Sequence, residues 1–346
     1  MTTRFENFLN AFDEKTWLAT VTALLPEIHE VDRNATQIWF RFFPLELFRT
    51  LQASENKEEL IRKFVLQGNY ELKNQIDSSH KFLYGHRYWK EIKDAIIRRA
   101  ESFGGENADL AREIKRIAET VAAEAKVDSS LLVGITAVGL MTLAQVGLEA
   151  LKNAPGKIYI DANHLKLSPE KALAERAKDD PQGFFSFLKT VDKEWTVTYD
   201  ENKPGAKFKL INDEEIASAA ARDQSQNWRE QDARCIEGVI PVECRSAACG
   251  TCWIGVLGGA EKLSNVSRRE ERQMKVFGYN QPSEPRPILR LACQARATGA
   301  VSIVIPPWNG VFGKAVYGVE EVEFAPATTS AAKLREKIAQ ATSGSN

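Results

Sequence analysis

Hydrophobic positions in the first half of the chain recur at helical spacing. Apolar side chains three and four residues apart run through residues 5–25, 88–103 and 108–125, where glycine and proline are sparse. This period places the apolar side chains on one face of each helix, and a helical bundle buries such faces. We therefore predict that residues 1–190 form an all-α domain.

Residues 131–148 form an uncharged segment that differs from these amphipathic stretches. Its eighteen residues just reach the length, about 18 apolar residues, at which a transmembrane helix becomes a candidate. Three glycines, two threonines and Gln145 lower its hydrophobicity, so we predict a central helix that is buried on all sides in the bundle. A helix that contacts a membrane or another copy of the chain is the alternative.

Two further features of this half have structural rather than chemical interpretations. The aromatic run at 39–48 is expected to belong to the hydrophobic core, and a pocket or partner groove is the alternative. His80 and His86 are six residues apart, so they do not share a helical face and we do not expect a metal pair there. We identify no family resemblance in this half of the chain.

The second half changes from helical spacing to alternation. Residues 195–211 alternate apolar and polar side chains around an Asn-Lys-Pro-Gly turn, which predicts a β-hairpin. Asn212 is a candidate N-cap for a helix over 214–224, and residues 267–278 have a second helical pattern. Residues 301–307 are typical of a terminal strand. The whole chain is therefore expected to be of the α+β class.

Four cysteines give the second half its candidate chemistry. Cys244, Cys249 and Cys252 have C-x4-C-x2-C spacing, and Cys293 follows after a long gap. This is the ligand spacing of a plant-type [2Fe–2S] cluster, in which four thiolates hold two irons. Three cysteines within nine residues require a loop, because a helix or strand would point their sulfurs apart. The small residues between them leave backbone N–H groups free to hydrogen-bond the sulfurs.

The sequence around these cysteines resembles a known family. The segments CRSAACGTC (244–252) and RLACQ (290–294), together with the closing strand, resemble plant-type and adrenodoxin-like [2Fe–2S] ferredoxins over residues 195–308. The resemblance implies a β-grasp fold for this part of the chain. It also implies a [2Fe–2S] cluster as the cofactor and electron transport as the activity.

The resemblance further implies how the ligands are shared between the irons. In the family, the first two loop cysteines hold the outer iron, which is the one reduced, and the other two hold the inner iron. By resemblance, Cys244 and Cys249 hold the outer iron. Cys252 and Cys293 hold the inner iron.

Two departures from the family pattern occur near the cysteines. Ala247 stands where many plant-type ferredoxins have glycine, two residues before the second cysteine. An insertion at 225–238 carries Cys235, which is expected to be a buried apolar residue rather than a ligand.

Zinc is the alternative metal, although zinc knuckles prefer two C-x2-C pairs and this segment has one. A Rieske centre needs two histidines, and all four histidines lie upstream.

Charge and cysteine content narrow the function further. The chain has 46 basic and 47 acidic residues without a basic stripe, so nucleic acid is not an expected partner. Cluster thiolates favour a reducing cytoplasm, and the N-terminus has no apolar signal core. Membrane association through 131–148 is the alternative location. Acidic and basic residues balance between 192 and 312, whereas freely diffusing ferredoxins are strongly acidic, which favours a dedicated partner.

These observations predict a one-electron carrier that its helical domain docks to a dedicated redox partner protein. An oxidoreductase whose helical half binds a substrate or second cofactor is the first alternative, and a redox-sensing or assembly subunit is the second. We assign no catalytic residues, and a homo-oligomer or larger complex is compatible with each interpretation. The expected domains are helical (1–190), ferredoxin-like (191–312) and an extension with a mobile tail (313–346). Residues 306–324 are expected to fold back on the helical half.

Overall fold

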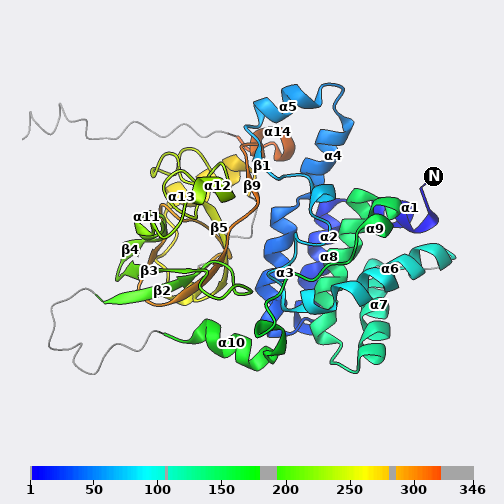
Figure 1. Ribbon diagram of the computed structural model, residues 1–346. Helices are drawn as coiled ribbons and strands as arrows, with labels where there is room; N and C mark the ends of the chain where they lie inside the picture. The colour runs from blue at the N-terminus through cyan, green and yellow to red at the C-terminus, as the bar shows by residue number, and fades with distance from the viewer. Residues whose placement is uncertain (1, 106–107, 180–192, 280–285, 321–346) are drawn as a thin grey trace, which may run out of the picture.

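The computed structural model describes residues 2–105, 108–179, 193–279 and 286–320. In Figure 1 a group of helices lies beside a smaller part that contains a β-sheet. The first half is helical, as predicted, apart from the two-residue strand β1 (Gln67–Gly68). Its α-helices are α1 (Arg4–Asn10), α2 (Glu14–Leu24), α3 (Glu30–Phe42), α4 (Leu45–Ala53), α5 (Lys57–Lys63), α6 (Trp89–Ser102), α7 (Leu110–Ala125), α8 (Ser130–Val146), α9 (Leu148–Asn153) and α10 (Pro169–Ala177). Its 3-10 turns are η1 (Leu25–Glu27), η2 (Leu72–Asn74), η3 (Tyr84–Tyr88) and η4 (His164–Lys166).

Helix α8 is the centre of the bundle and packs against α3, α6 and α7. Every residue from Leu131 to Gln145 is buried, which confirms the expectation of a central helix. A Cβ at Gly134 would overlap Thr36, and one at Gly139 would overlap Ile96, so glycine lets the neighbouring helices approach closely. In the part of the chain that the structure describes, no helix is both long and apolar enough to cross a membrane.

The second half is built on a five-stranded sheet with the order β3–β2–β8–β5–β6. The central strands β2 and β8 are parallel, and the other neighbours are antiparallel. The expected α+β class is therefore observed. The elements of this half are β2 (Glu194–Thr198), β3 (Lys207–Ile211), β4 (Glu214–Glu215), α11 (Ile216–Arg222), α12 (Trp228–Gln231), β5 (Trp253–Gly258), η6 (Ala260–Lys262), α13 (Arg268–Phe277), β6 (Leu289–Leu291), β7 (Arg296–Ala297), β8 (Val301–Val304), β9 (Trp308–Asn309) and α14 (Gly313–Tyr317).

The local expectations for this half are met in all but one case. Strands β2 and β3 form the hairpin over 195–211, and Ser267 caps α13 by accepting the Glu270 N–H. Asn212 is not a helix cap, because the chain first forms β4 and the helix begins at Ile216. The Asn212 side chain instead accepts a hydrogen bond from the Trp195 indole over 3.0 Å.

The two halves share one continuous apolar core. Phe42 at the end of α3 contacts the Trp253 ring of β5 at a centroid distance of 5.0 Å. The Trp308 indole donates to the Phe42 carbonyl over 2.7 Å, and strand β9 pairs with β1. The Tyr317 hydroxyl of α14 donates to Glu14 of α2. Residues 306–320 therefore fold back on the helical half as expected, whereas the rest of that segment and the expected mobile tail at 324–346 lie outside the described residues.

The two buried histidines hydrogen-bond to each other. His80 Nδ1 and His86 Nδ1 are 2.9 Å apart. His86 Nε2 accepts the Tyr159 N–H, so the neutral ring carries its proton on Nδ1 and donates to His80. His80 Nε2 then donates to the Ile76 carbonyl. Sequence spacing alone did not predict this contact, because an irregular segment rather than one helix brings the rings together.

Candidate iron–sulfur site

The paired strands β5 and β6 position two of the four cysteines. Cys252 immediately precedes β5, and Cys293 follows the end of β6. Trp253 pairs with Leu291 in the antiparallel register, and the Ala292 N–H donates to the Cys252 carbonyl over 2.8 Å. The strand pairing therefore brings together two cysteines that are distant in the sequence.

The four cysteine thiols form two pairs, and the two members of each pair shift each other's pKa. Cys244 pairs with Cys249 in the loop, and Cys252 pairs with Cys293 at the strand ends. The hydrogen bond from Cys252 lowers the pKa of the Cys293 thiol to about 6. This arrangement fits a cluster in which each of two irons takes two thiolates. It is also the pairing that the ferredoxin resemblance implies, and the ligand role of the four sulfurs stays a prediction.

A single zinc ion fits this donor set poorly. A zinc site holds its four donors about 2.0–2.3 Å from one metal, so all four must converge on one point. Among the described residues, no group of three or more His, Cys, Asp or Glu side chains converges closely enough to hold one metal ion. Two separate sulfur pairs suit a two-iron cluster, since each pair then serves its own iron.

Hydrogen bonds to the Cys244 sulfur favour its charged thiolate form, whereas burial raises the pKa of Cys249 above its usual value. The N–H groups of Ser246 and Ala248 donate to the Cys244 sulfur over 3.5 and 3.3 Å. Burial raises the pKa of Cys244, but these hydrogen bonds, together with one from Cys249, more than offset it, and the pKa lies below its usual value. The Cys249 sulfur lies 3.2 Å from the Thr251 hydroxyl. Such hydrogen bonds spread the negative charge that four thiolates bring to a cluster.

The loop backbone turns through the left-handed region three times. Arg245, Ala247 and Gly250 have φ of 51°, 57° and 74°. Ala247 thus takes the conformation that glycine adopts without strain, although it carries a Cβ. Glycine is required at Gly250 for a second reason, because a Cβ there would lie 2.8 Å from the Phe277 ring.

The two sulfur pairs differ in how deeply they are buried. Cys244 and Cys249 are half-buried, whereas Cys252 and Cys293 are 2% and 1% exposed. The Gln294 amide adds a 3.5 Å contact to the Cys293 sulfur. An iron bound by the first pair would therefore lie nearer solvent, as the resemblance implies for the outer iron.

The sequence did not indicate a role for Tyr279 and Trp253, two buried aromatic residues next to the loop. The Tyr279 hydroxyl lies 2.9 Å from the Gly250 carbonyl and accepts the Gly310 N–H over 3.0 Å. Its ring stacks on Trp253, with centroids 3.8 Å apart and planes 8° apart. The available signal was the position of Trp253 directly after Cys252. Tyr279 thus joins the cysteine loop to the segment that returns to the helical half.

Cys235 is separate from the four candidate ligands. Its side chain is 4% exposed, and its sulfur lies 3.2 Å from the Val239 carbonyl. Burial raises the pKa of this thiol to about 12, so it stays protonated at neutral pH. The expectation that Cys235 is buried is confirmed.

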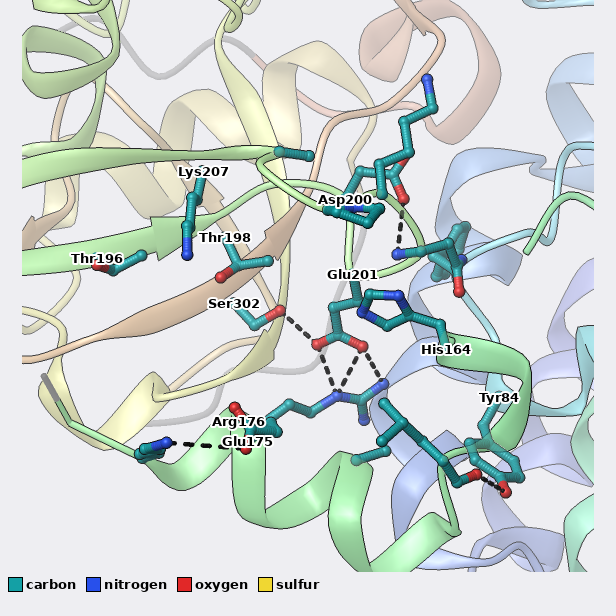
Figure 2. A pocket seen from close by; sticks show the side chains of 18 of the residues that line it. Tyr84, His164, Glu175, Arg176, Thr196, Thr198, Asp200, Glu201, Lys207 and Ser302 are labelled. Atoms are coloured by element: carbon teal, nitrogen blue, oxygen red, sulfur yellow. Dashed lines mark hydrogen bonds and ion pairs between the residues drawn. The ribbon is translucent and has the colours of Figure 1, made fainter. Parts of the chain in front are cut away.

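A second polar feature lies at the boundary of the two halves, in a cavity of about 420 Å³. Figure 2 shows Arg176 of α10 and Glu201 of the hairpin pointing toward each other. Glu201 also accepts from Ser302 of β8, and Arg176 donates to the Val31 carbonyl of α3. The ion pair therefore ties α10 to both halves. None of the four candidate cysteine ligands, all of which the structure describes, lines this cavity.

Comparison with known proteins bears on the second half of the chain. The family model of the 2Fe-2S iron-sulfur cluster binding domain matches residues 212–298. No curated protein matches the chain, and no solved structure matches it. The matched range holds all four candidate ligands and does not include the helical half. The C-terminal part is a ferredoxin-type domain with a [2Fe–2S] cluster, through which it transfers electrons.

Proposed function

We propose that the protein is a one-electron carrier of the plant-type or adrenodoxin-like kind, with its cluster bound by Cys244, Cys249, Cys252 and Cys293. The observation that carries this proposal is the arrangement of these sulfurs as two pairs of unequal burial. A β-grasp arrangement is supported by the sheet order, in which the first and last long strands are the parallel central pair. Thiolate ligands also favour our proposal of a cytoplasmic location.

Different residues near the four cysteines stabilise charge and exclude water. A bound [2Fe–2S] cluster supplies reversible one-electron chemistry, at a potential on the order of −400 mV for this ligand set. The Ser246 and Ala248 N–H groups oppose the build-up of negative charge at Cys244. Phe277 and Tyr279, which are 1% exposed, exclude water from the inner side of the loop.

We further propose that a partner protein docks across both halves at the edge of the loop. Ile236 is 61% exposed and belongs to the segment whose Glu237 pairs with Arg245 of the loop. Val65 is 51% exposed and precedes β1. The Gln67 side chain of β1 donates to Glu243, the residue before Cys244. We propose that these two exposed side chains belong to the partner contact, because each lies on a segment that is tied to the cysteine loop. The helical half would thus contribute directly to partner recognition.

The backbone at Val65 supports this assignment. Val65 has a φ of 49°, and β-branched residues rarely adopt this left-handed conformation. Such strain persists where the surrounding structure holds it, and it concentrates at functional positions. Here it turns an apolar side chain outward beside the loop instead of into the core.

Reductive titration tests the proposed carrier function. Purified protein should contain two irons and two sulfides per chain. Dithionite should deliver one electron per chain, and electron paramagnetic resonance should then show one rhombic spin-half signal. One zinc per chain without a visible chromophore would refute the ligand assignment. Failure of the reduced protein to pass its electron to any acceptor would refute the carrier function, whereas reduction of a small molecule would show that the carrier also serves an oxidoreductase.

A further inference from the structure

An apolar cavity of about 470 Å³ lies where the helical half meets the C-terminal segment. This volume falls in the range of small-molecule sites, about 300–1,000 Å³. The aromatic run at 39–48 therefore contributes both to the core, as expected, and to a pocket. The apolar side chains that form the wall include Phe42, Phe43, Leu47, Phe48, Leu51 and Trp308.

A continuous series of aromatic rings leads from the cysteine loop to this cavity. Tyr279 contacts the loop at Gly250 and stacks on Trp253 at 3.8 Å between centroids. Trp253 then meets Trp308 edge-on at 5.5 Å and Phe42 edge-on at 5.0 Å. Trp308 and Phe42 both line the cavity.

This series begins on the inner side of the site. Trp253 directly follows Cys252, which belongs to the buried sulfur pair. Electron transfer through protein slows steeply with distance, and rings in van der Waals contact shorten each gap between donor and acceptor. The geometry thus gives the cluster an inward exit that is separate from the exposed loop edge.

The lining of the cavity selects the chemical class of its ligand. Its aromatic and aliphatic wall suits a flat apolar ring system. Asn10, Gln52 and Tyr70 also line the cavity, and their side chains carry hydrogen-bond donors of the kind that carbonyl oxygens accept. A dicarbonyl ring, that is a quinone, has both properties.

Other redox cofactors fit this lining less well. A flavin nucleotide carries phosphate, but the two lysines of the cavity, Lys57 and Lys73, both pair with Glu71. A haem needs an axial ligand, and no His, Met or Cys occurs among the described residues that line the cavity.

We propose that this cavity binds a quinone, which receives electrons from the reduced cluster through Tyr279, Trp253 and Trp308. The inference rests on the proposed one-electron function. Each transfer returns the cluster to its oxidised form. Two such transfers, with two protons from solvent, convert the quinone to its hydroquinone, and a one-electron donor protein reduces the cluster again between them. The chain would then be the electron-feeding part of a quinone reductase.

Equilibrium dialysis of menadione against the oxidised holoprotein tests the site without using electron transfer. We expect one saturable site per chain. Leu47→Trp fills the cavity and should weaken binding at least tenfold, as should Ala144→Leu, a smaller change in the same wall. The matched control is Ala172→Trp, which lines the other cavity and should bind menadione like the wild type.

Stopped-flow mixing of the dithionite-reduced, desalted protein with menadione tests the route. The oxidised-cluster absorbance should return at a rate that saturates with menadione in the wild type and Ala172→Trp. In Leu47→Trp this rate should fall at least tenfold, with the cluster spectrum unchanged. Absence of saturable binding, or equal rates in all variants, would overturn the proposal and place the exit at the loop edge. A cluster that accepts no electron from dithionite would refute the carrier function, while the dialysis result would still decide the site.

Discussion

Ala247 shows how a single residue is held in place by the chemistry around it. Its left-handed backbone costs an L-residue about 1–2 kcal/mol relative to the right-handed form. In return its N–H points to the Cys293 sulfur, where the hydrogen bond helps to lower the pKa of that thiol. Alanine therefore occupies here a left-handed conformation that glycine would adopt without strain.

Substitution at this position tests the conformational requirement. Ala247→Gly should keep the full iron content, because glycine adopts this backbone without strain. Ala247→Val should lose most of the iron, because a β-branched residue is disfavoured at this φ and the site is 1% exposed. Iron analysis and visible absorbance measure both results. Ala248→Val is the control, since Ala248 is exposed and should keep its cluster; equal iron in both valine variants would contradict the argument.

Cysteine substitution separates the ligands from the remaining thiol. Cys235→Ser should leave the visible spectrum and the iron content intact, because the buried thiol stays protonated and belongs to neither sulfur pair. Cys249→Ser should lose or strongly alter the cluster. Bleaching of the Cys235→Ser protein would show that the ligand assignment is wrong.

Spacing alone predicted the candidate ligands because cluster chemistry fixes the number and kind of donors. It did not reveal Tyr279, whose importance depends on a ring stack between elements that only the folded chain brings together. For the same reason, the sequence presented His80 and His86 as unrelated, whereas the fold places their rings in hydrogen-bond contact.

At the scale of elements, sequence patterns predicted secondary structure correctly where that structure depends on neighbouring residues. The hairpin over 195–211 and the helix over 267–278 were both predicted from patterns within a few neighbouring positions. Asn212 failed as a cap because a tertiary contact competed with it: residues 214–215 pair with β7, and the Asn212 side chain turns to Trp195. Helix α11 then begins without a side-chain cap.

The histidine pair makes the junction of η3 with the Tyr159 segment sensitive to acid. Burial lowers the pKa of His86 to about 4 and that of His80 well below its usual value. The unfolded chain therefore binds more protons below about pH 6.5, so this stability is present above that pH and is lost as the pH falls toward 4. For His86 alone, the free energy of unfolding should fall by about 2 kcal/mol between pH 7.5 and pH 5.

Urea unfolding at both pH values measures this effect. His86→Gln removes the titrating group, so its loss of stability between pH 7.5 and pH 5 should be smaller than that of the wild type. Acid loss of the cluster affects both proteins alike, and the difference between them isolates the histidine. An unchanged pH dependence in His86→Gln would show that the pair does not titrate in this range.

At the scale of the whole molecule, the sequence predicted a helical half and a ferredoxin-like half, but not the extent of their contact. The run at 39–48 was recognisable as apolar, yet nothing in its pattern showed that Phe42 would meet Trp253. Contacts across more than two hundred residues leave no periodic signal, because periodicity reports only the face that an element buries. The boundary near residue 190 stays a prediction.

Expression of residues 191–320 alone tests this boundary. The fragment contains all four cysteines and the five-stranded sheet, so it should assemble a visible cluster. Its urea midpoint should lie below that of the full chain, because Trp253 and Trp308 lose their contacts with Phe42. Full-length Phe42→Ala, which should lose about 3–5 kcal/mol, measures how much of the difference comes from that one ring. A colourless fragment would mean that the halves form one cooperative unit.

The hydrogen bond from Trp308 to Phe42 joins residues 266 positions apart, and this has a consequence for synthesis on the ribosome. At about 5–20 residues per second, the α3 end and the β1 edge emerge tens of seconds before the segment that covers them. During that interval Phe42 has no tryptophan partner and β1 has no strand to pair with. A nascent helical half is therefore exposed to aggregation and to chaperone capture until the C-terminal strand is made. Iron that binds the cysteine loop before β9 pairs with β1 would bind a loop whose buried side is not yet fully packed.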